Sequence, residues 1–261
     1  MFTSNPYAEL SAFISPSAMQ TYVVVMAILV AAGTIYDVLH KKSAIYFREN
    51  MRKSKATATQ KVGGGDMVSM AIKTAIVDVA TSGEFCNPRR RIAHLLTMYG
   101  FLAYVIATAS MIFWYPTPAT PAPTILAQLW FVGALMVCVG GYWFWFFIRV
   151  DVAAEGNSPF RIVRADLFIL SMLASATLAL VWAYLQSTGN SWAKAFFGLH
   201  VIATTVLFGS VPWSKFAHMF FKPAAAFEKR VSAANGSRSN LPAPADKPET
   251  FGSVGQQSRH Y

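Results

Sequence analysis

Long apolar runs separated by polar or basic stretches dominate the pattern of this chain. Five runs each have about twenty residues, the length that an α-helix needs to cross the hydrocarbon core of a bilayer. The pattern therefore predicts an all-α integral membrane fold, a bundle of five transmembrane helices within residues 1–230. The predicted spans are residues 19–39, 92–115, 124–148, 163–186 and 193–211.

The polar segments between the spans are expected to lie in water. Residues 1–18 are a short, nearly uncharged arm, and residues 40–91 are a long polar loop in which 66–81 have a weak helical pattern suited to the membrane surface. Four prolines between positions 116 and 123 exclude a helix and predict a stiff hairpin. The Ser-, Pro- and Gly-rich residues 231–261 are expected to be a disordered tail, either solvated or partner-binding.

The net charge of +10 follows the predicted topology. With five spans, residues 40–91, residues 149–164 and everything after 212 share one side, and they hold 21 of the 22 lysines and arginines. The positive-inside rule then places the N-terminus outside and the C-terminus in the cytoplasm, in a bacterial or archaeal cytoplasmic membrane. Topology explains the basic balance with no need for nucleic acid, and the basic loops suit anionic lipid or an acidic partner.

Composition excludes several other classes. The chain is 54% hydrophobic and 13% charged, values that a soluble protein of 261 residues rarely has. Cys86 and Cys138 form no CxxC pair, so neither a disulfide scaffold nor an iron–sulfur cluster bound by this chain alone is expected. The first apolar run ends in His-Lys-Lys without a small-residue cleavage site, which predicts a retained span.

Histidines are the candidate cofactor ligands. His200 and His218 are eighteen residues apart, which places them on one helix face about 27 Å apart if the helix is unbroken. Such a pair suits the two levels of a two-heme electron carrier, and it equally suits a packing histidine with an interfacial one. His94 lies at the depth of His218 and can face it, with His40 as a competing partner. Heme b needs a neutral imidazole nitrogen, usually one from each of two helices.

Arginines near His94 suit the propionates of a heme. The positive-inside rule alone also accounts for arginines at this boundary. The candidates are Arg89, Arg90, Arg91, Arg161 and Arg164.

The depth of His200, near the outer side of the predicted membrane and called the outer level below, offers no second histidine. Tyr104 on the second span and Met26 on the first lie at depths comparable to that of His200, and an unpartnered buried imidazole costs free energy. One arrangement is an outer heme on His200 whose sixth site is Tyr104, Met26 or nothing. The other has no heme, and His200 hydrogen-bonds Tyr104 or a quinone carbonyl. Helix packing alone is the third interpretation, and Lys194 is a candidate for a quinone pocket.

Three segments together resemble a family of membrane cytochromes. They are residues 211–219 with His200 upstream, residues 85–101 around His94, and residues 155–158 before the fourth span. They resemble the membrane domain of the C subunit of the quinone-interacting membrane-bound oxidoreductase. That domain belongs with the gamma subunit of respiratory nitrate reductase and the cytochrome subunit of membrane heterodisulfide reductase. The resemblance covers residues of about 70–230.

The resemblance implies a five-span cytochrome b that passes electrons between membrane quinone and cytoplasmic iron–sulfur or flavoprotein subunits. Such a chain is an electron-transfer subunit with no catalytic residue of its own. The implied ligands of heme iron are His94, His200 and His218, whereas Tyr104 stands where the family pattern has a histidine. One heme b is therefore expected, and a second stays open.

The resemblance also narrows the partner. The quinone-interacting C subunit carries a ferredoxin-like domain that this sequence lacks, so the chain is similar to the stand-alone membrane anchor associated with adenylylsulfate reductase. Two rivals stay open, a heme-free anchor that docks a soluble redox enzyme and a small transporter or channel. The spans carry few ionisable groups, which counts against an ion path.

Overall fold

The computed structural model describes residues 3–83, 85, 87–149, 162–214, 216 and 218–237, with the backbone alone at His218 and Phe220. These residues form helices and the turns between them, and this part of the chain has no strand. The predicted all-α fold is therefore confirmed for the described residues. Outside them lie residues 150–161, which include Arg161, residues 238–261, and Cys86.

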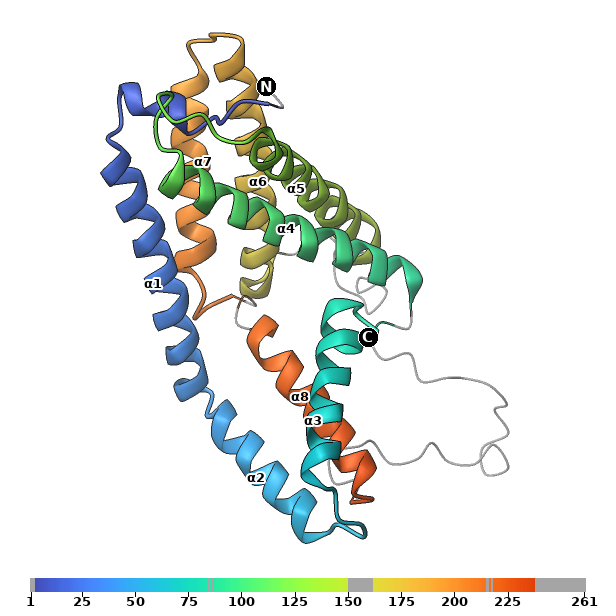
Figure 1. Cartoon of the computed structure of the whole chain (residues 1–261). Coiled ribbons are helices and arrows are strands. Elements are labelled where there is room, and N and C mark those ends of the chain that lie inside the picture. Colours follow the sequence, from blue (N-terminus) through green and yellow to red (C-terminus); the bar gives the residue numbers. More distant parts are fainter. Residues whose placement is uncertain are drawn as a thin grey trace.

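Four helices of the described chain are long and apolar enough to cross a membrane, and a fifth is apolar but shorter. The π-helical turn η3 (Phe144–Ile148) extends one of them, and the 3-10 turn η5 (Arg164–Asp166) precedes another. The four long ones are α1 (Pro16–His40), α4 (Pro88–Trp114), α5 (Thr124–Trp143) and α6 (Leu167–Ser187), and the fifth is α7 (Ala193–Gly209) (Figure 1).

Local sequence sets the beginnings of two of these helices. The Ser15 side chain accepts a hydrogen bond from the Ala18 amide before α1, and the Asn87 side chain accepts one from the Arg89 amide before α4. A proline follows each cap, where its missing N–H costs nothing. The two caps explain why the helices begin a few residues before the predicted apolar runs.

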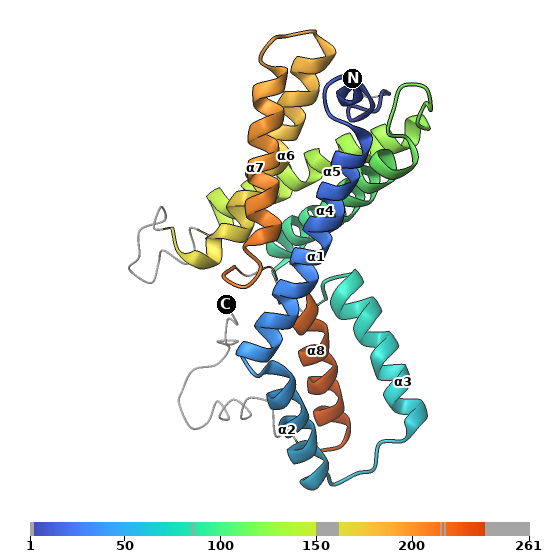
Figure 2. The ribbon, with the colours of Figure 1, turned by 90° about the vertical axis from the view of Figure 1, so that its left-hand side faces the viewer.

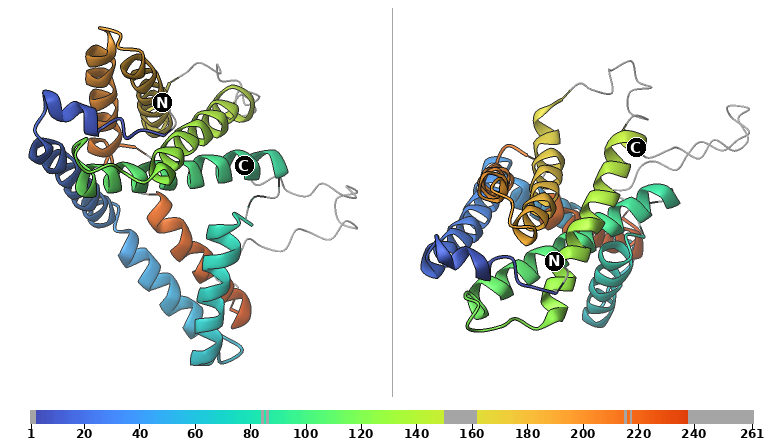
Figure 3. Two further views of the ribbon diagram at one scale, coloured as in Figure 1. Left: turned by 45° about the horizontal axis from the view of Figure 1, so that its top comes forward. Right: turned by 90° about the horizontal axis from the view of Figure 1, so that it is seen from above.

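The five apolar helices form a ring. Contacts join α1 to α7, α7 to α6, α6 to α5, α5 to α4, and α4 back to α1, an order that the view from above shows (Figure 3). The core between them is aromatic and small, and Trp130, Phe131 and Trp182 are fully buried. Residues 3–14, which include the 3-10 turn η1 (Ala8–Ala12), fold over one end of this ring, called the arm end below.

Helices α4 and α5 pack backbone to backbone. A Cβ atom at Gly133 would lie 2.7 Å from both the Gly100 carbonyl and the Tyr104 amide nitrogen, and one at Gly140 would lie 2.7 Å from the Ala93 carbonyl. Small residues at such positions let helices approach closely in a membrane protein, where packing drives association. This contact fixes the position of α4.

A second layer of helices extends beyond the ring at the end opposite the arm (Figure 2). The sequence predicted a polar loop over residues 40–91, with a weak helix at 66–81; the structure has helices over much of this stretch because they pack on one another. The layer consists of α2 (Ser43–Ala56), α3 (Gly64–Lys73), the π-helical turn η2 (Thr74–Ala80) and α8 (His218–Ala234).

Polar contacts hold this layer together. The Ser54 hydroxyl lies 3.2 Å from that of Ser232, and the Asn235 amide donates to the Ser54 hydroxyl at 2.8 Å. Arg230 forms a two-pronged ion pair with Asp78 at 2.8 and 2.9 Å. Ser232 and Asn235 are buried, so residues 231–237 belong to this folded layer, and the rest of the predicted tail lies outside the described residues.

Candidate cofactor site

His200 is the most deeply buried candidate ligand among the described residues. Its side chain comes from α7, is 6% exposed and lies 3.0 Å from the Ser175 carbonyl through Nδ1. A carbonyl only accepts, so Nδ1 carries the proton, and Nε2 of the neutral ring has the lone pair. Among the described residues, nothing hydrogen-bonds to Nε2. The ring therefore has the protonation pattern that a metal-ligating imidazole needs.

Aromatic side chains surround His200 and connect it to Tyr104. The Trp182 ring stacks on the imidazole with centroids 5.9 Å apart, Trp130 lies 6.2 Å from Trp182, and Tyr104 lies 5.5 Å from Trp130. The Tyr104 hydroxyl is buried and has no hydrogen-bond partner in the described structure. The structure thus brings Tyr104 and His200 into the same core.

Ser175 on α6 positions the His200 ring. Its carbonyl accepts from Nδ1 at 3.0 Å, and its hydroxyl lies 3.5 Å from the same nitrogen and 2.8 Å from the Thr204 hydroxyl. Nothing in the sequence singles out Ser175, because it is one of several serines in an apolar run and lies 25 residues from His200.

The other two candidates of this level lie apart from that core arrangement. Met26 is buried on α1. The Lys194 ammonium lies 5.0 Å from the centroid of the Phe13 ring, so it contacts the folded N-terminal arm. Lys194 is therefore at the arm end, on the outer surface of the ring.

His94 lies near the beginning of α4, whereas the end of α4 contacts the N-terminal arm. Its Nδ1 lies 2.9 Å from the Ser82 hydroxyl, and the Phe85 ring lies 4.9 Å from the imidazole. Ser82 is fully buried and has a left-handed backbone, with a φ of 50°. A hydroxyl can donate or accept, so this contact orients the ring and leaves the tautomer open.

Two more side chains of α4 hold the same turn. Arg91 donates through Nε to the Thr81 carbonyl at 2.8 Å, and the Tyr99 hydroxyl donates to the Ala80 carbonyl at 2.7 Å. Arg89 is exposed and Arg90 is half-buried. Three of the predicted propionate partners, Arg89 to Arg91, thus lie on α4 within five positions of His94, and one N–H of Arg91 already has a structural role.

His218 is the first residue of α8, and its side chain is not described. The condition for a shared face, one unbroken helix from His200 to His218, is not met. Helix α7 ends at Gly209, and a turn follows in which the Trp213 and Ser214 amides donate to the Ser210 carbonyl. Pro212 lies in this turn and cannot donate to a helical ladder. The eighteen-residue spacing therefore gives no common helix face.

His40 lies apart from these groups. It ends α1, is exposed, and stacks on Tyr36 with ring centroids 5.5 Å apart. The described residues also contain no cluster of three or more His, Cys, Asp or Glu that could hold a metal ion. Any bound iron would depend on histidines brought together from separate helices.

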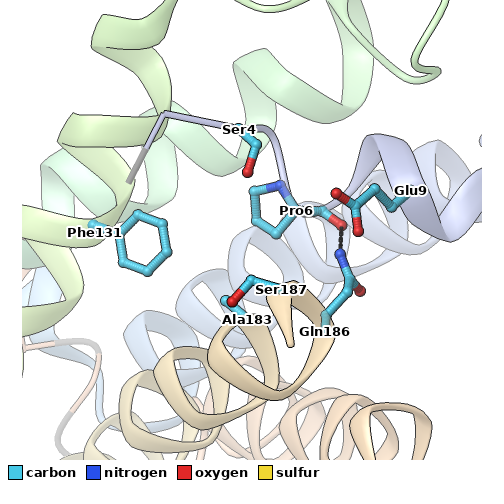
Figure 4. A pocket seen from close by; sticks show the side chains of 7 residues that line it. All are labelled: Ser4, Pro6, Glu9, Phe131, Ala183, Gln186 and Ser187. Carbon is cyan, nitrogen blue, oxygen red and sulfur yellow. Dashed lines mark hydrogen bonds between the residues drawn. The ribbon is translucent and has the colours of Figure 1, made fainter. Parts of the chain in front are cut away.

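A shallow pocket at the arm end is linked to His200 by hydrogen bonds and stacking. Its cavity volume is only about 10 Å³, which is about the room that one water molecule needs. Gln186 donates to the Pro6 carbonyl at 2.8 Å, and its own carbonyl accepts from the Trp182 indole at 2.9 Å. The lining residues are Ser4, Pro6, Glu9, Phe131, Ala183, Gln186 and Ser187 (Figure 4).

The fold and site define a helical protein suited to a bilayer, with a buried imidazole among aromatic rings. No protein-family model and no solved structure matches the chain. Citrate utilization protein B of Escherichia coli is 25% identical over 174 residues, which are 61% of this chain and 44% of that protein. The chain thus spans less than half the length of this curated relative, and the match is distant and partial.

Proposed function

We propose that the chain is a membrane-embedded electron-transfer subunit. It would bind heme b and pass electrons between membrane quinone and a cytoplasmic iron–sulfur or flavin oxidoreductase, with adenylylsulfate reductase as the candidate partner. The observation that carries the proposal is the His200 imidazole, whose Nδ1–H is fixed by a carbonyl and whose Nε2 has no hydrogen-bond partner in the described chain. Packing alone does not require that arrangement in an apolar core.

His200 suits the outer level of such a carrier. The Ser175 carbonyl orients the ring and keeps the proton off Nε2, and the stacked indole of Trp182 fixes its plane. A bound heme b would supply one-electron redox chemistry there. Tyr104 lies in the same aromatic core with an unpartnered hydroxyl, so we propose it as a polar neighbour or a ligand at this level.

His94 and His218 suit the inner level. Ser82 and Phe85 position the His94 ring, and α8 begins at His218. The guanidinium groups of Arg89, Arg90 and Arg91 would neutralise propionates there. The exposed His40 is the rival partner in this level.

The orientation in the membrane follows from charge. Eight of the 17 described lysines and arginines lie on α2, α3 and α8, at one end of the ring, whereas Lys194 alone among them lies at the arm end. The proposal places this layer in the cytoplasm of a bacterial or archaeal cell and the arm end outside. A quinone would then react near the arm end, where Lys194 and the shallow pocket lie.

The test is heme counted per chain by the pyridine hemochrome method, together with a spectroscopic redox titration. We expect His200→Ala to lower the count by one, and His94→Ala to remove the low-spin inner heme. His40→Ala is the matched control, because that imidazole is exposed and stacked only on Tyr36.

Three outcomes would contradict parts of this proposal. An equal heme count in wild type and His200→Ala would make His200 a structural or quinone-facing residue. Loss of the inner heme in His40→Ala would replace His94 with its rival. A chain without heme would favour the second candidate function, a heme-free anchor, which the basic layer beyond the ring also supports.

A further inference from the structure

The N-terminal arm inserts the Tyr7 side chain into the aromatic core of the ring of helices. Tyr7 is 3% exposed, and its ring centroid lies 5.9 Å from that of Trp130 and 5.2 Å from that of Trp182. The other side of the arm faces water, where Ser4 and Glu9 are exposed. The arm is therefore a thin surface layer, and Tyr7 fills the space beside the two indoles.

The Tyr7 hydroxyl is held as a hydrogen-bond acceptor. The indole N–H of Trp130 donates to it at 3.2 Å and to the Thr108 hydroxyl at 3.0 Å, and the two hydroxyls lie 3.5 Å apart. Trp130 and Thr108 belong to α5 and α4, not to the arm. A carbonyl oxygen on another six-membered ring could therefore accept the same hydrogen bond in place of Tyr7.

A second polar group in this core lacks an acceptor. The Tyr104 hydroxyl is buried without a hydrogen-bond partner in the described structure, and the Tyr104 ring lies 5.5 Å from that of Trp130. A buried polar group without a partner costs free energy, so a ligand that accepts a hydrogen bond from it would be stabilised. Tyr104 and Tyr7 thus pack on the same indole, one without a partner and the other in a replaceable position.

We infer that Tyr7 occupies the site of a quinone head group and that the arm is the lid of this site. The identity of the ligand rests on the proposed function. A benzoquinone has a flat six-membered ring like that of Tyr7, which suits packing against indoles, and its carbonyl oxygens accept hydrogen bonds. One carbonyl oxygen would take the place of the Tyr7 hydroxyl beside Trp130, and the other would supply the acceptor that Tyr104 lacks.

This site lies close to the candidate outer ligand. The Trp182 ring contacts Tyr7 and also stacks on the His200 imidazole, with centroids 5.9 Å apart. A quinone ring in place of Tyr7 would therefore be separated from His200 by a single indole.

The arm has to move before a quinone can enter. The shallow pocket beside it, at Pro6, has room for only about one water molecule (Figure 4). The arm is held by the hydrogen bonds of Asn5 to the Tyr115 carbonyl and of Gln186 to the Pro6 carbonyl, and neither bond lies within a helix. The closed arm thus competes with the quinone, whose apparent affinity is reduced by the fraction of chains that have the arm open.

The first experiment removes the competing ring. Binding of decylubiquinone, the probe, to the full chain in nanodiscs is measured by quenching of tryptophan fluorescence. Tyr7→Ala should lower the Kd at least about tenfold, as expected when about 10% or less of the chains are open. The loss of a buried ring should also lower the midpoint of thermal unfolding. Phe113→Ala removes a ring that is 40% exposed near the same end of α4, and this control should leave the Kd unchanged.

The second experiment removes a hydrogen-bond donor. Tyr104→Phe should raise the Kd about threefold to tenfold, because the quinone loses one hydrogen bond. The midpoint of thermal unfolding should not fall, since the hydroxyl has no partner in the described chain without quinone. The matched control is Tyr184→Phe, at a tyrosine on α6 that is 56% exposed, which should change neither value.

Unchanged or weaker binding in Tyr7→Ala would overturn the lid, and unchanged binding in Tyr104→Phe would overturn the site. Equal quenching in all the variants would show that the probe only partitions into lipid, which overturns both. Heme is counted on the same samples. A chain with heme whose quinone binding ignores both substitutions refutes this site alone, whereas a heme-free chain with the expected shifts refutes electron transfer through heme and retains the quinone site.

Discussion

The two ends of the molecule are stabilised by different interactions. At the arm end, Trp130 and Trp182 are fully buried and pack edge to face, 6.2 Å apart, beneath the folded arm. In the layer of α2, α3 and α8, the fully buried side chains include Ser54 and Ser232, and an ion pair holds η2. Aromatic packing makes a dry and rigid environment, whereas hydrogen bonds between hydroxyls allow more adjustment.

The same difference appears at His200 and His94, the two described histidines of the candidate site. His200 meets a backbone carbonyl, which fixes its tautomer, and a tryptophan ring, which fixes its plane. His94 meets a serine hydroxyl, which permits either tautomer. A backbone carbonyl therefore fixes both the orientation and the tautomer of an imidazole, whereas a hydroxyl fixes its orientation alone. The His200 site is thus the better defined of the two.

The largest expected effect tests the aromatic core. Trp130→Ala should lower the free energy of unfolding by about 3–5 kcal/mol, since it removes a fully buried ring. It also leaves the Tyr7 and Thr108 hydroxyls without the indole N–H that they share, at 3.2 and 3.0 Å. The measurement is denaturant unfolding in detergent, followed by circular dichroism. Trp114→Ala, at a tryptophan that is 70% exposed, is the control, and equal losses in both variants would contradict this account of the arm end.

A smaller loss is expected where α4 and α5 touch. Gly133→Ala should cost about 1–3 kcal/mol, because the new methyl group would lie 2.7 Å from backbone atoms of Gly100 and Tyr104. The matched control is Gly198→Ala on α7, where nothing lies within 4 Å of the added carbon and alanine is the better helix former. The midpoint of thermal unfolding should fall in Gly133→Ala, and in Gly198→Ala it should rise or fall clearly less. A tolerated Gly133→Ala would show that this helix contact is loose.

The smallest effect concerns pH in the second layer. Burial raises the pKa of the Glu228 carboxyl above its ordinary 4.5, and a hydrogen bond with Asn50 opposes this. The folded state therefore binds the proton more tightly than the unfolded state. The free energy of unfolding then falls as the pH rises from the ordinary pKa through the raised pKa of Glu228.

Glu228→Gln should be more stable than wild type near pH 7, and the two proteins should have the same stability below about pH 4. Thermal unfolding across this range is the measurement, and the exposed Glu49→Gln should change little; a wild type whose stability rises through this window would contradict the assignment.

Apolar length allowed the helices of the ring to be predicted, because membrane-spanning runs are long and leave a strong local signal. The helix Ser43–Ala56 has no such signal and packs on α8 through Ser54, about 180 residues before its partners in sequence. A single sequence cannot show that pairing. Pro212 predicts a helix break near Gly209 from the sequence alone. Nothing in the sequence predicts that the next helix begins at His218.

The candidate ligands were readable from the sequence, and their partners were not. His94 and His200 stand out because histidine is rare in apolar spans. The groups that orient them, the Ser175 carbonyl and the Ser82 hydroxyl, come from other elements through long-range packing. The imidazoles could therefore be found from the sequence, and the structure was needed to show which group contacts Nδ1 of each one.

The N-terminal arm sets an order for assembly during synthesis. Asn5 donates to the Tyr115 carbonyl and Gln186 donates to the Pro6 carbonyl, so the arm is held by residues that follow 110 and 180 positions later. At about 5–20 residues per second, Gln186 leaves the ribosome about 10–40 s after Pro6. During that interval the arm lacks its hydrogen bond to Gln186, so the arm end closes fully only after α6 has been made.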